Sequence, residues 1–409
     1  MQRRGYRLAR IILHCDLNCF YASVELLSHP ELRDVPVAVC GDPESRHGII
    51  LAKNEPAKRF GVQTAETIWQ AKRKCPDLTL LRSHRDQYRA YSKQVNAIYD
   101  EYTDLVEPFG IDESWLDVTN TLHLFGGDAV ALADHLRRRM REELGLTLSV
   151  GVSFNKVFAK LGSDYKKPDA TTLISPENWQ EIVWPLPVGA LLYVGHAAQA
   201  LLHQYGAETI GHLAAMPAET LERLMGRLGI RLHDYANGLD NDPVRSRYDR
   251  EPVKSVGNGT TFPQNLTTRL EVRNAVAILA DSVASRLRHN GLYACGIQVT
   301  IRDPNFHDRS RQRQLPAPTH LIRELTAAAM SLIDELWTPP SPLRMITITA
   351  IHLAAEGEAY EQMDLFTAPA VPKNEKQEKL EGAMERIRGK FGTDAIGFGA
   401  GQLTNKEEP

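Results

Sequence analysis

A carboxylate at the end of a buried strand is the feature of this sequence that most constrains its fold. The apolar run 10–15 predicts a short buried strand that leads into Asp16, and Asp112 and Glu113 lie between two further predicted strands. A carboxylate is costly to bury unless it is paired or bound to a metal ion. The fold must therefore either gather these groups at one place or leave them in water.

Carboxylates gathered in this way suit a hard divalent cation such as Mg²⁺, which often completes its shell with substrate phosphates. Two such ions about 4 Å apart would bridge the attacking and the leaving oxygen of a displacement. In the alternative interpretation, Asp16 is a turn residue and the later pair a polar loop. Adjacent strand residues face opposite ways, so Asp112 and Glu113 converge only across a turn, which Gly110 permits.

The order of the predicted elements indicates several domains, as expected for 409 residues. Strands mix with helices over about the first 175 residues, which is typical of an α/β or α+β core. From 188 to 238 the pattern changes to short helices interrupted by glycine. A second mixed region follows, with a helix over 270–289 and strands over 294–302 and 345–353, and an amphipathic helix is predicted over 375–388.

Basic residues are unevenly distributed, although the formal net charge of the chain is −3. Residues 243–323 hold 13 Lys or Arg against 6 Asp or Glu. Basic residues alternate with others over 302–313, which favours a sheet that lies along a phosphate backbone, with chance clustering as the alternative. Lys58 and Lys167 also suit phosphate as point charges, or belong to solvated helix faces.

The cysteines argue against a disulfide framework or a zinc site, because the 5 are odd in number and none is in CxxC spacing. His14, Cys15 and Cys19 lie close together, but no second pair of ligands follows, so we expect buried thiols in a reducing cytosol. The basic start of the chain precedes an apolar run too short for a signal peptide. No run reaches the ~20 apolar residues of a membrane helix. We expect a cytoplasmic protein with no membrane partner.

Together these residues resemble the Y-family DNA polymerases, the translesion enzymes of the DinB/UmuC type, from Ile11 to about Leu353. Three motifs in the family's order carry the resemblance: 16–25 (DLNCFYASVE), 109–118 (FGIDESWLDV), and 149–156 (SVGVSFNK) with Lys160 and Lys167. The segment that begins at Lys254 is similar to the entry of the family's extra DNA-binding domain. Three motifs in the family's order are specific evidence for the resemblance, whereas any one of them alone would be weak evidence.

The fold that this resemblance implies is α+β and multidomain. It is a right-hand polymerase with a ferredoxin-like palm, small fingers, a helical thumb and an α/β little-finger domain. The implied segments are the palm at 1–19 and 86–180, the fingers at 20–85, a helix-hairpin-helix-like thumb at 181–243, a linker at 244–250, the little finger at 251–356 and a tail at 357–409.

The resemblance also implies roles for particular residues. Two Mg²⁺ ions, with Mn²⁺ as a possible substitute, would be bound by the side chains of Asp16, Asp112 and Glu113 and the carbonyl of Leu17. Tyr21 falls at the steric-gate position, where a ring excludes the ribose 2′-OH; taken alone, it would better fit a half-buried aromatic of a helix. Nucleotide contacts are implied for Phe20, Lys58 and Lys167. DNA contacts are implied for Lys254, Arg302, Arg309, Arg311 and Arg313.

The implied reaction is attack of a primer 3′-OH on the α-phosphate of a dNTP, directed by a template. It would serve low-fidelity translesion synthesis and DNA repair by a monomer acting on primer–template DNA. No further set of carboxylates suggests proofreading. Two other classes stay open: a catalytically silent accessory of the same fold, and a nucleotidyl cyclase, which also pairs aspartates.

Two local features complete these expectations. Residues 361–366 resemble the clamp-binding peptide of bacterial polymerases, with Gln362 at the rim of the pocket and apolar anchors from Met363, Leu365 and Phe366, so a sliding clamp is an expected partner. Glu55 stands where the family commonly has tyrosine, and Lys58 replaces the more usual arginine. Glu55 should repel a nucleotide unless it points away or pairs with Lys58.

Overall fold

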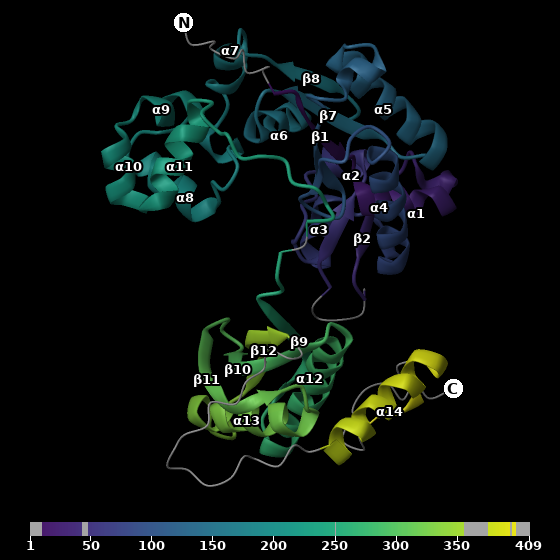
Figure 1. Cartoon of the computed structure of the whole chain (residues 1–409), viewed down its shortest axis with the longest axis vertical. Helices are drawn as coiled ribbons and strands as arrows, with labels where there is room; N and C mark the ends of the chain where they lie inside the picture. The colour runs from purple at the N-terminus through teal and green to yellow at the C-terminus, as the bar shows by residue number, and fades with distance from the viewer. Residues whose placement is uncertain (1–9, 43–47, 250, 356–374, 393–394, 398–409) are drawn as a thin grey trace, which may run out of the picture. The chain divides into compact units, whose positions relative to one another are not determined.

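The computed structural model separates into two compact units, residues 1–250 and 251–409 (Figure 1). The residues that it describes are 10–42, 48–249, 251–355, 375–392 and 395–397. Within these ranges, no helix has both the length and the apolar character needed to cross a membrane.

The first unit is built on a five-stranded sheet. Its strands, in spatial order, are β5 (Val106–Pro108), β6 (Glu113–Asp117), β1 (Ile12–Leu17), β7 (Leu148–Ser153) and β8 (Thr171–Ile174). Only β8 is parallel to its neighbour. The helix α4 (Arg85–Tyr99) lies between β1 and β5 in the chain, and α5 (Ala129–Leu144) lies between β6 and β7. The four antiparallel strands thus form a ferredoxin-like βαββαβ arrangement, as expected.

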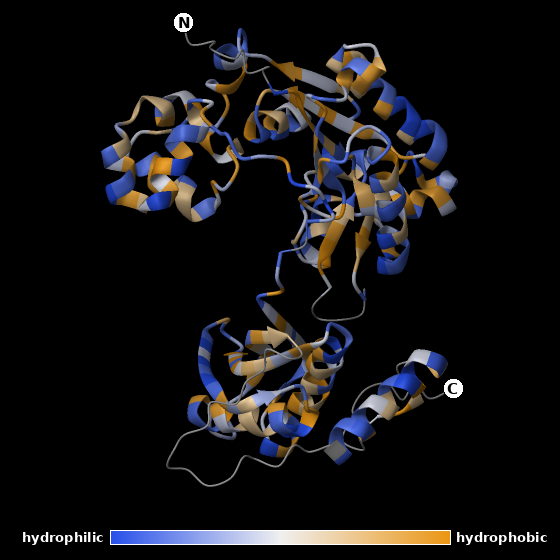
Figure 2. Ribbon diagram, in the orientation of Figure 1, coloured by the Kyte–Doolittle hydropathy of each residue, from blue (hydrophilic) through white to orange (hydrophobic). Residues whose placement is uncertain are grey.

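Both faces of this sheet are covered, which explains why all six residues of β1 are buried. The helices α1 (Phe20–Ser28), α4 and α5 share a core with one face, and α6 (Lys156–Tyr165) packs on the other. The strands accordingly are largely apolar, and the helices have polar outer faces (Figure 2). The backbones of α6 and β7 approach so closely that a Cβ on Gly151 would lie 1.8 Å from the carbonyl oxygen of Ala159.

A smaller sheet with its own core lies within the first unit. Its strands, in spatial order, are β3 (Ile50–Lys53), β2 (Val37–Cys40) and β4 (Thr79–Arg82), and its core includes residues of α2 (Glu55–Arg59) and α3 (Ile68–Lys74). Asn54 caps α2, because its side chain accepts a hydrogen bond from the backbone N–H of Ala57.

The segment predicted as short helices interrupted by glycine forms a helical cluster. It consists of α8 (His196–Gln204), α9 (Ile210–Ala215), α10 (Ala218–Met225) and α11 (Arg227–Ala236). Gly195 precedes α8, and Gly226 separates α10 from α11. The cluster shares an apolar core with α6, in which Phe158 and Leu202 are fully buried.

The second unit is a four-stranded antiparallel sheet with helices on one face. The strands, in spatial order, are β11 (Asp308–Thr319), β10 (Leu292–Arg302), β12 (Leu343–Ala355) and β9 (Ser255–Leu266). The helices α12 (Arg269–His289) and α13 (Ile322–Leu336) share its core. The sequence analysis identified β10 and β12 but missed β9 and β11. The edge strand β11 begins with seven exposed residues, so it has no apolar alternation to detect.

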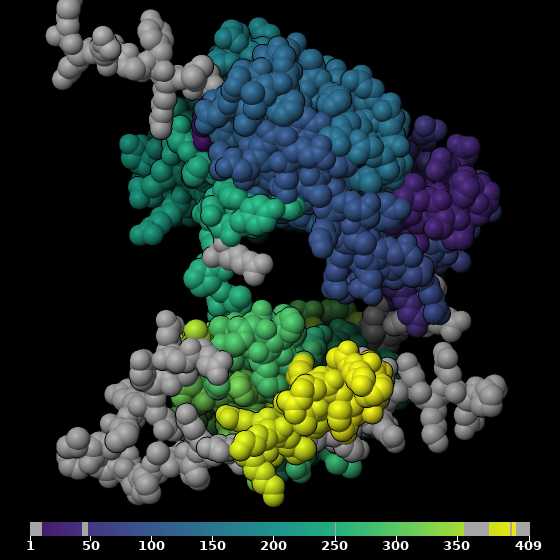
Figure 3. Space-filling model, turned by 45° about the vertical axis from the view of Figure 1, so that its right-hand side comes forward, coloured from purple at the N-terminus to yellow at the C-terminus, as the bar shows by residue number. Residues whose placement is uncertain are grey.

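The predicted last helix exists as α14 (Glu375–Phe391) and packs on the helical layer of the second unit (Figure 3). Glu381 is fully buried and forms an ion pair with Arg288 at 2.6 Å. Its carboxylate also accepts a hydrogen bond from the backbone N–H of Ile322 at the start of α13. Arg388 forms a second ion pair with Asp281 at 2.7 Å. The helix is therefore an integral part of this unit.

Candidate active site

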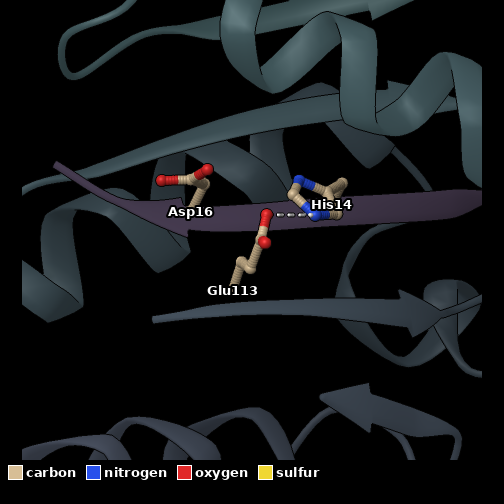
Figure 4. Close-up of side chains that lie close together, drawn as sticks. All are labelled: His14, Asp16 and Glu113. Carbon is tan, nitrogen blue, oxygen red and sulfur yellow. Dashed lines mark ion pairs between the residues drawn. The ribbon is translucent and has the colours of Figure 1, made fainter. Parts of the chain in front are cut away.

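The pairing of β1 with β6 brings together the carboxylates that are far apart in the sequence. Asp16 lies opposite Glu113 in the register of the two strands, and the backbone N–H of Leu17 donates to the carbonyl of Asp112 at 3.0 Å. Both Asp16 and Glu113 lie inside their strands, whereas the sequence analysis placed them just outside. One ligand atom from each of His14, Asp16 and Glu113 lies within 4.8 Å of the others (Figure 4).

Asp112 completes the acidic cluster from the bend that precedes β6. A Cβ on Gly110 would lie 3.3 Å from the Asp112 Oδ1 atom and from the Glu113 Cγ atom, so both side chains turn toward this glycine, as the sequence analysis required. Burial and the neighbouring charges of Asp16 and Glu113 raise the pKa of Asp112 to about 6. Asp112 is thus the member of the cluster on which burial and the repulsion of the other two carboxylates act together.

Two side chains orient Glu113. Its Oε2 atom lies 3.3 Å from His14 Nε2 and 2.5 Å from Lys160 Nζ. Burial opposes ionisation of Glu113, but the close contacts with His14 and Lys160 outweigh it and lower the pKa of Glu113 to about 2. His14 itself is fully buried, and its Nδ1 atom is 2.8 Å from the hydroxyl of Ser163.

The sequence analysis gave His14 no role in this cluster. It treated this histidine only as a weak metal candidate beside the cysteines. A usable signal was the strand period of two, which puts His14 on the same face as Asp16.

Lys167 supplies the cation beside Asp16. Its ammonium lies 2.7 Å from the carboxylate of Asp16 and 2.7 Å from that of Asp164. Burial disfavours the charge on Lys167, but the two carboxylates more than compensate and raise its pKa. The nucleotide contact expected from the sequence therefore lies directly against the acidic cluster.

The acidic cluster lies in a cleft of about 480 Å³, which all three predicted catalytic carboxylates line. The residues from the β1 end of the cleft include Asp16, Leu17, Phe20 and Tyr21, and those from the small sheet include Lys53, Lys58 and Thr64. Asp112, Glu113, Lys160 and Lys167 also line it. The cleft therefore places lysines around carboxylates, as binding of metal ions and a polyphosphate would require.

The carboxylate of Glu55 is not unpaired, because it forms an ion pair with Lys58. The Lys58 ammonium is 2.6 Å from Glu55 Oε1, and the thiol of Cys19 donates to the same oxygen at 3.3 Å. The sequence analysis required either this pairing or an outward orientation of Glu55. Lys58 consequently has a carboxylate partner in this structure.

The arginines expected to contact DNA do not share one face of the second sheet. Residues directly opposite in an antiparallel pair lie on the same face. Arg309, Arg311 and Arg313 lie opposite buried residues of β10, so they are on the helix side, where Arg311 and Arg313 contact Glu335 of α13. Arg302 lies on the other face. The sequence did not indicate which face each arginine takes, because the faces follow from the register of β11 with β10, and the expected DNA contacts stay predictions.

Two other expected sets of contacts belong to the chain after residue 250. Lys254 is exposed just before β9 and lies 3.7 Å from Glu251. The proposed clamp peptide with Gln362, Met363, Leu365 and Phe366 falls outside the residues that the structure describes.

Comparison with known proteins agrees with this geometry. Residues 15–164 match the model of the impB/mucB/samB family, and residues 253–365 match that of the family's C-terminal domain. The chain is 45% identical to the DNA polymerase IV of Acetivibrio thermocellus over 94% of this chain and 96% of that protein. It is 37% identical to DNA polymerase IV 1 of Bacillus subtilis, over 98% and 94% respectively.

A solved structure supports the fold independently. The Y-family DNA polymerase chimera of Dbh and Dpo4 covers 84% of this chain and 99% of its own, with a TM-score of 0.74 at 22% identity. Fold and cleft thus define a right-hand polymerase. The chain belongs to the impB/mucB/samB family of Y-family DNA polymerases, among relatives named DNA polymerase IV. This confirms the prediction of a DNA-directed DNA polymerase of low fidelity in translesion synthesis and repair.

Proposed function

We propose that the cleft binds an incoming dNTP with two Mg²⁺ ions and joins the nucleotide to a primer 3′-OH, with release of pyrophosphate. The observation that supports this most is the convergence of Asp16, Asp112 and Glu113 in a cleft that lysines also line. Family membership supplies the general reaction, and the geometry of these side chains supports the particular chemistry.

The donor atoms suit Mg²⁺, or Mn²⁺ in its place. The three carboxylates, with the carbonyl of Leu17 in the same cleft, are hard oxygen ligands. Burial and the charges of Asp16 and Glu113 raise the pKa of Asp112, and a divalent cation bound at the site would offset both effects. When bound, the ions would lower the pKa of the attacking hydroxyl and neutralise charge on the phosphates.

The remaining side chains would bind and orient the substrate. Lys167 can transfer its contact from Asp16 to a phosphate oxygen, because a lysine ammonium is a mobile point charge. His14 and Lys160 hold Glu113 in one orientation. The ring of Tyr21, beside Phe20, would occupy the space that a ribose 2′-OH needs.

The proposal assigns the parts of the chain as the family pattern implies. The large sheet would be the palm (1–19 and 86–180), the small sheet the fingers (20–85) and the helical cluster the thumb (181–243). Residues 244–250 would link them to the little finger (251–356). Its helix-free face, with Arg302, Thr347 and Thr349, would lie along the DNA, while the arginines of β11 would reach phosphates from the sheet edge.

Primer extension tests the metal-site assignment. We expect Asp112→Ala to lower the extension rate with Mg²⁺ by about a hundredfold or more, since it removes a ligand of the ions that would balance the negative charge of the transition state. Asp86→Ala is the matched control, because the Asp86 side chain is 97% exposed. Undiminished activity of Asp112→Ala would refute the assignment. A wild-type protein that cannot extend a primer would be a silent accessory, and one that cyclises a nucleotide without primer would be a cyclase.

The proposal also includes a monomer in the cytoplasm that reaches a sliding clamp through 362–366. A peptide with one glutamine and three apolar anchors after the last sheet strand supports this partner. Deleting 362–366 should slow extension only when the clamp is present. An equal loss without the clamp would indicate a folding defect and would contradict the clamp role.

A further inference from the structure

Two lysines, one in the small sheet and one in the helix that follows its strand β3, line the cleft, and they differ in the charged groups that contact them. Lys53 is the last residue of β3, and Lys58 lies in α2. Lys58 was expected from the sequence to contact the nucleotide, whereas Lys53 was not singled out. Both residues line the same cleft. The lysine with the weaker counter-charge beside it should therefore attract an anion more strongly.

Lys58 is neutralised locally. Its ammonium forms an ion pair with Glu55 at 2.6 Å, and both side chains are only partly exposed, at 39% and 38%. Glu55 also accepts a hydrogen bond from the thiol of Cys19, which fixes the carboxylate in place. A phosphate that contacts Lys58 must therefore compete with a carboxylate that is already bound there.

Lys53 has a neutral partner instead. Its ammonium donates to the hydroxyl of Thr64 at 2.8 Å, and Thr64 lines the same cleft. Within the part of the chain that the structure describes, Lys53 forms no ion pair with a carboxylate. Burial and the nearby charge of Lys58 lower the pKa of Lys53, and the more distant carboxylates of Glu66 and Glu55 only partly offset them. The ammonium therefore has a hydroxyl but no carboxylate in direct contact, and an anionic ligand in the cleft would supply the missing counter-charge.

We propose that Lys53, oriented by Thr64, is the principal contact from the small sheet to the polyphosphate of the incoming nucleotide. Lys58 contributes less, because its ammonium is occupied by the ion pair with Glu55. This inference rests on the proposed nucleotide site and identifies the residue that compensates for an acidic side chain there. A polyphosphate in the cleft would meet an unpaired ammonium on one side and the metal-binding carboxylates on the other.

Steady-state kinetics of Lys53→Ala test the inference. We expect the KM for dNTP to rise roughly tenfold while kcat stays within about twofold, since a charge-assisted hydrogen bond to the bound substrate is lost. Inhibition by inorganic tripolyphosphate, which has no base or sugar, should weaken by the same factor. Lys53→Arg should restore both values, and Lys72→Ala, at an exposed lysine of α3, should change neither.

A second variant separates the two lysines. Glu55→Gln should lower the KM for dNTP, because Lys58 becomes available, and it should partly rescue Lys53→Ala in the double variant. If Lys53→Ala leaves both the KM and tripolyphosphate inhibition unchanged in an enzyme that still extends primers, the inference is wrong while the proposed function stands. If no variant and no wild-type preparation extends a primer, the proposed function itself fails.

Discussion

The ring of Tyr21 stacks on the ring of Tyr88, with centroids 4.1 Å apart and planes inclined by 11°. Tyr88 is fully buried, and its hydroxyl donates to the carboxylate of Glu25. Tyr21 is in α1 and Tyr88 is in α4, so the packing of two helices fixes the ring that faces the cleft. The proposed steric gate is therefore rigid, since its ring cannot move back without displacing a buried partner.

Ribonucleotide discrimination should depend on both members of this stack. Tyr21→Ala should raise the kcat/KM for rNTP relative to dNTP by at least about tenfold, because the space for a 2′-OH opens. Tyr88→Ala should give a smaller increase, because the gate ring gains freedom, whereas Tyr88→Phe keeps the stack and serves as its control. Competitive incorporation assays measure the ratio. An unchanged ratio in Tyr21→Ala would remove the gate role.

The sequence indicated the acidic cluster because motif order identifies which distant segments meet. It did not indicate the geometry around that cluster, which depends on the strand register. His14 contributes because β1 is buried on both faces, so a polar residue two positions before Asp16 must find a partner inside the molecule. The sequence did not single out Lys53, because the charged groups near its ammonium depend on how α2 packs against β3. The two faces of β11 likewise follow from pairing with β10.

Removal of metal should expose the repulsion among the carboxylates. The folded-state pKa of Asp112 is raised to about 6, so between about pH 4 and pH 6 the folded protein binds more protons than the unfolded chain, and stability falls as pH rises. In chelator at pH 8, Asp112→Asn should therefore stabilise the first unit by about 1–2 kcal/mol. The gain should vanish near pH 4. Thermal melts with and without chelator measure it.

With metal bound, we expect the opposite order of thermal stability between the wild type and Asp112→Asn. With Mg²⁺ the wild type should melt higher than Asp112→Asn, because the ion binds only to the carboxylate form and stabilises the folded state. Asp86→Asn, at an exposed position of α4, should alter neither comparison. A variant that is no more stable than wild type in chelator at pH 8 would contradict the electrostatic account of the site.

DNA affinity should respond differently to Arg309 and Arg313, which lie on the same face of the second sheet but differ in their contacts with α13. Arg309→Ala should reduce the slope of log affinity against log salt by about 1 if its guanidinium contacts a phosphate. Arg313→Ala should do less, because Arg313 already contacts Glu335 and Ser331 of α13. Fluorescence anisotropy over a salt series makes the comparison. Equal slopes for wild type and Arg309→Ala would exclude this phosphate contact.

The docked tail helix should contribute measurably to the stability of the second unit. Arg288 donates to Glu381 and Glu385 of α14 and is itself only slightly exposed, so Glu381→Gln removes the buried partner of a buried charge. We expect a loss of about 3 kcal/mol in the free energy of unfolding.

Proteolysis and calorimetry of the full chain test this loss. Glu381→Gln should be cleaved faster within α14 than wild type, because release of the helix exposes its backbone. Arg386→Gln, at an exposed position on the same helix, removes a charge without touching α12 and should behave as wild type. Identical cleavage rates for Glu381→Gln and wild type would mean that the ion pairs with Arg288 do not hold α14 in place, and packing by buried Met384 would then have to account for the docking.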